Sequence, residues 1–377
     1  MDAAAPPAER RAPSAADLFD AMLARGASDL HLGVGSPPML RIKGELEPLA
    51  GHAALSAADL EALCHEWLTP AQLAQFERER DYDFAYAFGD RARFRGNLLY
   101  KRTGKGAVFR TIPSKIVDLA SLSTPPAIGQ LAHARAGLVL VTGPTGSGKS
   151  TTLAAMIDAI NQQRDGHILT VEDPVEFTHR AKRCQISHRE VGRDVVSYAE
   201  AIRSAGREDV DVILIGELRD CTTMRLALQA ASAGALVFAT VHTNSAAGTI
   251  DRFINAFVAE QQPAIRSMLA ECLLGIVAQQ LLRKKDGSGR VAVHEILLCN
   301  KAIASMIREG KTLQIVNAMQ AGRGEGMQLM DDTLLARVAD GTVAAADALA
   351  KAIDKASFLK DPKMVQAGFD PQAAVHV

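Results

Sequence analysis

An eight-residue segment, GPTGSGKS at positions 143–150, constrains the fold of this chain more than any other part of its sequence. It fits the pattern GxxxxGK(S/T) and directly follows the apolar run GLVLVT (137–142), which is typical of a buried parallel strand. The residues STTLAAMIDAI, which begin at its last serine, favour a helix. A strand, a glycine-rich turn and a helix in this order predict a phosphate-binding loop in an α/β fold.

The residues of this loop suit the binding of a nucleoside triphosphate. Glycines let the backbone curl so that successive N–H groups face the phosphates, and the helix after the loop points its positive end at them. Lys149 would reach the β- and γ-phosphate oxygens, and the hydroxyl of Ser150 would bind Mg²⁺. The predicted nucleotide-binding residues are Gly143, Pro144, Thr145, Gly146, Ser147, Gly148, Lys149, Ser150 and Thr151.

Three further apolar runs end in polar side chains. The runs are HILTVED (167–173), DVILIGE (211–217) and ALVFATVH (235–242). Glu217 stands where a carboxylate could hold Mg²⁺ or its water, and a carboxylate among Glu172, Asp173 and Glu176 could position or deprotonate an attacking water. His242 could sense the γ-phosphate. Because parallel strands end at one edge of their sheet, we expect these groups to converge on the phosphate site. The alternatives are a solvated loop for the acids and a structural role for the histidine.

Sequence periodicity divides the chain into a smaller front domain and a larger nucleotide domain. The front part mixes strand-like and helical segments and predicts an α+β domain. In the second part strands alternate with helix-length segments, which predicts an open parallel sheet. After about Pro263 we expect helices and one further strand, at 290–297. The expected boundaries are residues 1–15 for a disordered tail, 16–115 for the front domain, 116–126 for a linker, 127–350 for the nucleotide domain with its helical C-terminal region, and 351–377 for a C-terminal tail.

Composition argues against several other classes of protein. The 377 residues carry 42 Lys and Arg against 43 Asp and Glu, and this near neutrality argues against a dedicated nucleic-acid-binding protein. No apolar run approaches the roughly 20 residues that span a bilayer. The five cysteines are far apart and include no CxxC pair, so they indicate neither a disulfide framework nor a zinc ribbon. We expect them to be buried thiols in a reducing cytoplasm.

Together these motifs resemble one family, the secretion-type ATPases, and within it the type IV pilus retraction ATPases. The similarity runs from about Ser28 to Val343. It rests on the segments SDLHLGVGSPPMLRIKGEL, ARFRGN, GAVFRTIPSK, GPTGSGKSTT, TVEDPVEF, REVGRD, AIRSAGRED, DVILIGELRD, ATVHTNSAAGTIDR, AIRSMLAE, GRVAVHEIL, AIASMIREGKTLQI and GMQLMDDTL. The resemblance implies a hexameric ring of subunits with a PAS-like front domain and a RecA-like motor domain, which bind ATP and Mg²⁺ at the interface between the two domains.

The resemblance also implies roles for single residues. Residues 172–176 match the family's aspartate box, Glu217 its Walker B carboxylate and His242 its histidine box. Family precedent favours Glu176 as the general base.

Several arginines match positions that the family uses at the nucleotide. Charge on the γ-phosphoryl group in the transition state needs cations beyond the loop lysine and Mg²⁺. Arg203 and Arg207 are four residues apart, which predicts one helical face, and they match the family's segment that bears arginine fingers. Three arginines on expected front-domain strands resemble those that reach the nucleotide when the domains close: Arg93, Arg95 and Arg110. For each of the five, a solvated basic surface is the alternative.

Two features imply a motor that pulls rather than pushes. The segment AIASMIREG (302–310) resembles the family's AIRNLIREG motif, which is associated with retraction, although Ala304 replaces Arg and Ser305 replaces Asn. Pilus assembly and type II secretion ATPases generally have a tetracysteine zinc element, and this chain has none. The resemblance then implies a cytoplasmic protein at the inner membrane. It would reach the membrane through a platform protein, with a paralogous retraction ATPase as a second candidate partner and no direct contact with nucleic acid.

The sequence departs from the family pattern at a few positions. Ser232 and Ala235 replace a usual Glu and the first histidine of the histidine box, and Gly206 and Val210 replace a usual Leu and Pro. Loss of that histidine could slow hydrolysis or uncouple it from motion. These departures support one alternative, a weakly hydrolysing regulatory ring subunit that partners an active motor. An assembly or type II secretion ATPase is another. A nucleic-acid translocase is a weaker third.

Overall fold

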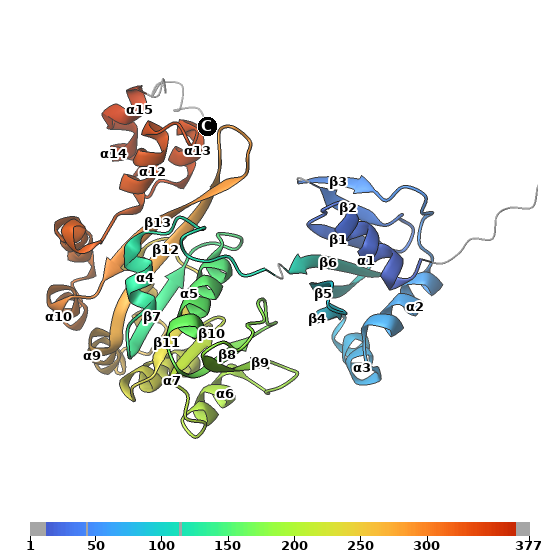
Figure 1. The fold of residues 1–377 in the computed structure, drawn as a ribbon, viewed down its shortest axis with the longest axis horizontal. Coiled ribbons are helices and arrows are strands. Elements are labelled where there is room, and N and C mark those ends of the chain that lie inside the picture. The colour runs from blue at the N-terminus through green and yellow to red at the C-terminus, as the bar shows by residue number, and fades with distance from the viewer. Residues whose placement is uncertain (1–12, 43, 113–114, 367–377) are drawn as a thin grey trace, which may run out of the picture. The chain divides into compact units, whose positions relative to one another are not determined.

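The computed structural model describes residues 13–42, 44–112 and 115–366. The chain forms two compact units, which meet in sequence between Lys115 and Ile116 (Figure 1). Most of the expected N-terminal tail lies outside the described residues. Its last two residues do not belong to a tail, because Ser14 caps the first helix and Ala15 begins it with only 2% of its surface exposed.

The first unit is an antiparallel six-stranded sheet in the order β3-β2-β1-β6-β5-β4, packed against three helices. Its strands are β1 (Asp29–Gly33), β2 (Met39–Ile42), β3 (Glu45–Pro48), β4 (Asp81–Phe88), β5 (Ala92–Lys101) and β6 (Gly104–Ile112), and its helices are α1 (Ala15–Ala24), α2 (Ala57–Trp67) and α3 (Pro70–Glu79). Each helix begins at a capping box, in which a Ser or Thr accepts from a backbone N–H three residues on. The core centres on Phe19, whose ring stacks on Phe94 with 4.4 Å between centroids.

The second unit is a seven-stranded sheet in the order β13-β12-β7-β11-β10-β8-β9. Its strands are β7 (Gly137–Thr142), β8 (Gly166–Glu172), β9 (Cys184–Glu190), β10 (Val212–Ile215), β11 (Leu236–Val241), β12 (Leu273–Arg283) and β13 (Arg290–Leu298). All neighbouring strands run parallel except β12 and β13, which form an antiparallel hairpin. The predicted α/β fold with a parallel sheet is confirmed.

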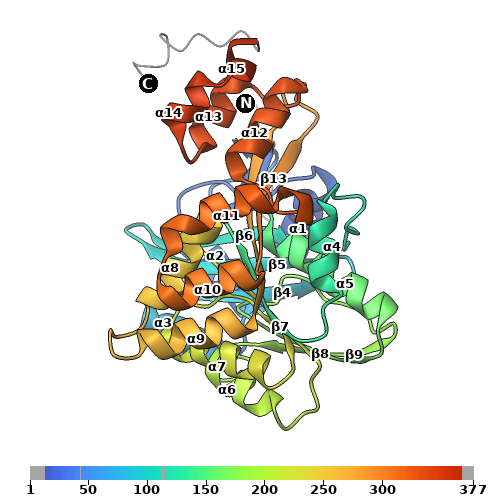
Figure 2. The same cartoon turned by 90° about the vertical axis from the view of Figure 1, so that its left-hand side faces the viewer.

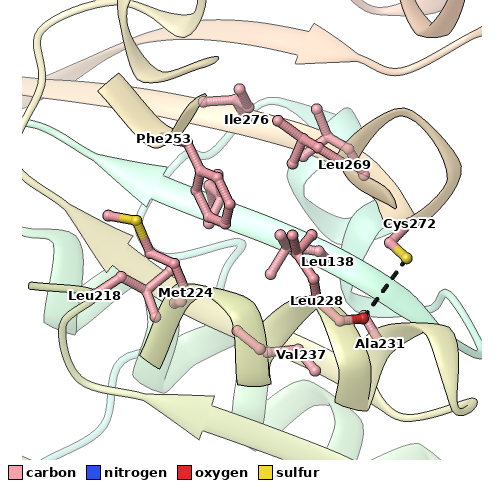
Figure 3. Packing of buried hydrophobic residues seen from close by; sticks show 14 of the residues in the cluster. Leu138, Leu218, Met224, Leu228, Ala231, Val237, Phe253, Leu269, Cys272 and Ile276 are labelled. Atoms are coloured by element: carbon pink, nitrogen blue, oxygen red, sulfur yellow. Dashed lines mark hydrogen bonds between the residues drawn. The ribbon is translucent and has the colours of Figure 1, made fainter. Parts of the chain in front are cut away.

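Helices cover both faces of this sheet. They are α4 (Pro126–Ala132), α5 (Lys149–Gln163), α6 (Tyr198–Ala205), α7 (Cys221–Ser232), α8 (Ala246–Asn255), α9 (Gln262–Cys272), α10 (Lys301–Glu309) and α11 (Ile315–Ala321), with short 3₁₀ turns at Thr312–Gln314 and Gly322–Glu325. Alternate residues of β7 point to opposite faces. Leu138 lies among Leu228, Phe253 and Leu269 on one side (Figure 3). On the other side Val139 joins the cluster formed with α4 and α5.

The sequence does not predict two strands of this sheet, β12 and β9. The run LLGIVAQQLLR of β12 is rich in Leu, Ala and Gln, which favour helices, and we expected helix there. It is a strand because β7 and β13 on either side satisfy its backbone, and because Gln279 and Gln280, although buried, have side-chain hydrogen bonds. The polar run of β9 pairs on one side only, as the edge strand of the sheet.

The C-terminal part of the described chain folds onto the hairpin of β12 and β13. It comprises α12 (Met330–Ala339), α13 (Ala345–Lys351), α14 (Lys355–Lys360) and α15 (Pro362–Gln366), which gather at one end of the unit (Figures 1 and 2). Phe358 and Met364 are buried among Leu334 and Val338 of α12. Residues 351–366, expected as part of a tail, therefore belong to the folded unit, and 367–377 lie outside the described residues. No helix within the described ranges is both long enough and apolar enough to cross a membrane.

Candidate nucleotide-binding site

The phosphate-binding loop leaves the carboxyl end of β7 and enters α5 at Lys149. Its backbone needs glycine at Gly143, Gly146 and Gly148, where φ is +146°, +77° and +88°. A side chain at Gly143 would also collide with the backbone carbonyl of Gln279 on β12. The tip of the loop is exposed, whereas Ser147 beside it is buried.

Gln279 on β12 holds this loop through side-chain hydrogen bonds, and sequence analysis does not predict this role. Its Nε2 donates to the carbonyl oxygen of Ser147 at 2.8 Å, and its Oε1 accepts from the hydroxyl of Thr152 at 2.7 Å. One side chain therefore ties the loop to the first turn of α5. The signal in the sequence was the pair of glutamines inside an apolar run, which requires buried hydrogen-bond partners.

Replacement of Gln279 by leucine is expected to weaken ADP binding about tenfold, equivalent to about 1.4 kcal/mol. The leucine leaves the Ser147 carbonyl and the Thr152 hydroxyl without their partner, and the loop loses its fixed shape. Calorimetric titration with ADP measures the effect. Gln280→Leu is the matched control, because the Gln280 side chain bonds instead to the Lys351 carbonyl. Equal ADP affinities for the two variants would contradict this role.

Lys149 lies inside the loop and is only 8% exposed. Its ammonium group donates to the carbonyl oxygens of Gly143 at 2.9 Å and Pro144 at 3.0 Å. Burial lowers the pKa of Lys149, and the negative charges of Glu217 and Glu176 oppose that shift. The predicted acids therefore act electrostatically on the predicted phosphate-binding lysine.

The acidic groups meet at the same edge of the sheet. One oxygen of Glu217 lies 3.3 Å from Nε2 of His242, and the other accepts from Nε of Arg219 at 2.8 Å. Arg219 also lies 3.9 Å from a carboxylate oxygen of Asp173. This arginine, which sequence reasoning missed, joins the segment after β8 to the segment after β10. Its position two residues after the predicted Walker B carboxylate was the available signal.

The chain after β8 folds back and holds the backbone of Glu176 near the site, where its charge acts on Lys149. The backbone N–H of Glu176 donates to Glu172 at 3.2 Å, and the backbone N–H of Val175 donates to Glu190 at 3.1 Å. The Asp173–Pro174 peptide bond is cis. Glu172 is buried, Glu176 is partly exposed and Asp173 is exposed. The three acids therefore occupy different environments within five residues.

A small pocket of about 30 Å³ opens beside the first turn of α5. Its lining includes Ser150, Glu172, His179, Gly216 and Thr240, which come from the loop, from the ends of β8, β10 and β11, and from the segment between β8 and β9. Within the described ranges, no three His, Cys, Asp or Glu side chains form a ready metal-binding cluster. A cation at this edge would therefore need oxygen atoms from a nucleotide or from water.

The predicted arginine pair is only half helical. Arg203 lies on α6, but the helix ends at Ala205, so Arg207 falls in the following turn and the prediction of one helical face is wrong. Gly206 is the C-cap, as its low helix propensity favours. Both arginines are exposed, and Arg207 contacts the carbonyl oxygen of Arg203 at 3.5 Å.

The three arginines of the first unit share one face of its sheet. Arg95 on β5 pairs directly with Arg110 on β6, and Arg93 lies two residues from Arg95 on the same side. Arg95 lies 3.3 Å from Asp83, and Arg110 lies 2.8 Å from Asp29. The opposite face of β5 is buried, so the alternation of the strand separates this basic face from the aromatic core.

Comparison with known proteins places the chain in a family. The family model described as type II/IV secretion system protein matches residues 82–350. The type IV pilus retraction ATPase PilT of Pseudomonas aeruginosa is 47% identical over 328 residues, 87% of this chain and 95% of that protein. The type IV pilus ATPase PilU of the same organism is 35% identical over 94% of this chain and 92% of that protein.

A solved structure agrees in fold as well as in sequence. The crystal structure of the pilus retraction motor PilT with bound ADP has a TM-score of 0.84 and 39% identity, over 94% of this chain and 99% of that chain. The phosphate-binding loop, the acids at the same sheet edge and these similarities agree: the chain belongs to the type II/IV secretion system protein family and is an ATPase of that family.

Proposed function

We propose that this chain forms a homo-hexameric motor that turns ATP hydrolysis into type IV pilus retraction, by disassembly of pilin at the cytoplasmic face of the inner membrane. The observation that supports it most is that the phosphate-binding loop and the predicted acidic residues lie at one edge of the sheet. Lys149 lies in the loop, Glu176 is held beside it, and Glu217 is fixed by Arg219 and His242. The similarity to a retraction ATPase over 87% of the chain supports the direction of the motor.

In the proposed reaction the loop holds ATP and the acidic segment prepares the water. The ammonium group of Lys149 would exchange its two carbonyl partners for β- and γ-phosphate oxygens. Glu176 would orient the attacking water and accept its proton. Glu172 and Asp173 would hold the segment and Arg219 in place through the contacts already described.

The site also suits a magnesium ion. Mg²⁺ prefers oxygen ligands, keeps several waters and is often held by one or two protein groups together with phosphates. The hydroxyl of Ser150 and the carboxylate of Glu217 would hold it, and the pocket beside Ser150 offers a further carboxylate in Glu172. When bound, Mg²⁺ neutralises charge on the phosphate oxygens.

Arginines from neighbouring subunits of the proposed hexamer would complete the site. Charge that develops on the γ-phosphoryl group is stabilised by arginine fingers, which commonly come from a neighbouring subunit. We assign this part to the exposed Arg203 and Arg207, and to the basic face of the first unit. That face comprises Arg93, Arg95 and Arg110.

Two of the departures from the family pattern, Ser232 and Ala235, lie away from the predicted phosphate-binding loop and acids within one subunit. Ser232 ends α7 and Ala235 directly precedes β11, whereas His242 directly follows that strand. β11 lies between Ala235 and His242, and the seven residue steps from one to the other span about 23 Å at 3.3 Å per residue. This favours an active motor over a weakly hydrolysing ring subunit.

Substitution of Ala235 by histidine, which restores the family residue, is expected to change the steady-state ATPase rate less than about twofold. The reason is its place at the sheet edge opposite the phosphate-binding loop. Phosphate release by the purified ring at saturating MgATP measures it. Negligible turnover of the unmodified chain, with a large gain in the variant, would favour the regulatory subunit instead.

The phenotype of a gene deletion distinguishes a retraction motor from an assembly motor. A retraction motor predicts excess surface pili and no twitching in the deletion strain, whereas an assembly or secretion motor predicts no pili or no change in their number. Counts of pili by electron microscopy decide between these. We further propose an inner-membrane platform protein and a paralogous retraction ATPase as partners. Stimulation of the ATPase by DNA would favour a nucleic-acid translocase.

A further inference from the structure

His179 is a buried side chain beside the acidic segment to which the proposed reaction gives no role. It follows Glu176 by three residues and is 5% exposed. Its Nδ1 has no hydrogen-bond partner among the residues that the structure describes. Buried polar atoms in proteins nearly always have a partner, so an unpaired nitrogen at a nucleotide site points to a ligand.

His188 on β9 contacts this histidine directly, and a residue of β8 holds His188. Its backbone N–H donates to Nε2 of His188 on β9 at 3.0 Å, and the two rings stack with 5.9 Å between centroids and 14° between planes. Nδ1 of His188 lies 2.8 Å from the hydroxyl of Thr170 on β8. His188, which Thr170 holds in turn, therefore fixes the backbone of His179 and stacks on its ring before any ligand binds, as a positioning group needs.

His179 also lines the small pocket, together with Ser150 and Glu172. Burial, with a smaller effect from His188, lowers the pKa of His179 to about 4, so the ring is neutral near pH 7. A neutral ring adds no positive charge next to a cation. It can form a hydrogen bond with water through Nδ1.

We infer that Nδ1 of His179 holds a water molecule of the Mg²⁺ hydration shell in this pocket, and thereby positions the cation that Ser150 binds. A water intervenes because Mg²⁺ prefers oxygen ligands and dehydrates reluctantly. Outer-shell partners of this kind typically change metal affinity by 10- to 100-fold. His179 is thus a positioning residue, and the inference rests on the proposed magnesium–nucleotide site.

Two substitutions of His179 distinguish the role of Nδ1 from the role of the other ring nitrogen, Nε2. Asparagine places a polar atom near the position of Nδ1, whereas glutamine places one near the position of Nε2. The measurement is ADP affinity of the full chain by calorimetry, in EDTA and across a series of Mg²⁺ concentrations. His179→Gln is expected to raise the half-saturating Mg²⁺ concentration about tenfold, and His179→Asn less than about threefold. Affinity for ADP in EDTA stays within about twofold for both. The exposed His133, replaced by glutamine, is the control.

The outcomes are decisive in each direction. Equal Mg²⁺ dependence of both variants and the unmodified chain, or an equal loss in both variants, overturns the role of Nδ1. Loss of ADP affinity in EDTA assigns His179 a merely structural role and overturns it too. If the variants do not fold, a crystal structure of the unmodified chain with ADP and Mg²⁺ tests the same point. A water bonded to both Nδ1 and the cation supports the inference, and its absence overturns it. Pilus counts test the proposed function separately.

Discussion

Replacement of Lys149 by alanine is expected to lower the ATPase rate more than 1,000-fold, an order of magnitude typical for loss of a cation at a transferring phosphoryl group. Lys149 is 8% exposed, and its ammonium group is held inside the loop by the carbonyls of Gly143 and Pro144. Alanine removes the positive charge from the place where charge develops on the γ-phosphoryl group. Phosphate release by the purified protein at saturating MgATP measures the loss.

The matched control is Lys285→Ala. Lys285 is exposed in the turn between β12 and β13, so its loss removes the same charge far along the chain from the loop. This control should keep the rate of the unmodified chain within about twofold. A Lys149→Ala variant that kept a tenth of the rate would refute the assignment of the phosphate site.

Replacement of Glu176 by glutamine is expected to lower the ATPase rate by about 10²- to 10⁴-fold, the usual contribution of a general base. Glutamine keeps the size of the side chain but cannot take a proton from water. The hydrogen bond from the Glu176 backbone N–H to Glu172 stays, so the segment keeps its position. ADP affinity should therefore change less than about threefold. Single-turnover phosphate release and ADP titration together separate the chemical step from binding.

Glutamine substitutions at two other carboxylates serve as the control and the comparison for this result. Glu260→Gln, at an exposed position between α8 and α9, should leave the rate unchanged. Glu217→Gln removes the charge that faces His242 and Arg219. It is expected to weaken Mg²⁺ binding and to lower the ATPase rate. If Glu176→Gln hydrolyses ATP at the unmodified rate while Glu217→Gln does not, another group activates the water.

Parts of the site that are local in sequence could be predicted from sequence. The eight residues of the phosphate-binding loop are consecutive, and its three glycines all have the positive φ that such a loop needs. The meeting of Glu172, Glu217 and His242 also followed, because parallel strands end at one edge. Even there the detail differs, since β10 ends at Ile215, two residues before Glu217.

Residues that act through distant contacts could not be found in this way. Gln279 lies 132 residues beyond the Ser147 carbonyl to which it donates, and it reaches the loop only because β12 pairs with β7. The sequence of β12 favours a helix, so the strand and its glutamine were missed together. No sequence motif singles out His179. Its partner His188 lies on the edge strand β9, which the sequence does not predict either.

Whether the C-terminal segment packs on the second unit could not be predicted, for a related reason. The segment containing Phe358 and Met364 forms helices of 6 and 5 residues, too short to give a hydrophobic period. Its burial depends on the apolar side of α12, which is known only from the fold. At Arg207 the signal was present, because Gly206 weakens the helix, but four-residue spacing alone predicted one face.

Retraction of individual pili tests the central claim most directly. Fluorescently labelled pili are imaged in a deletion strain that carries either the unmodified chain or the Lys149→Ala variant at equal expression. With the unmodified chain, pili should extend and shorten, and cells should twitch. With Lys149→Ala, pili should extend but not shorten, and accumulate on cells that do not move. Normal shortening with the variant, or failure to extend pili in the deletion strain, would contradict the account.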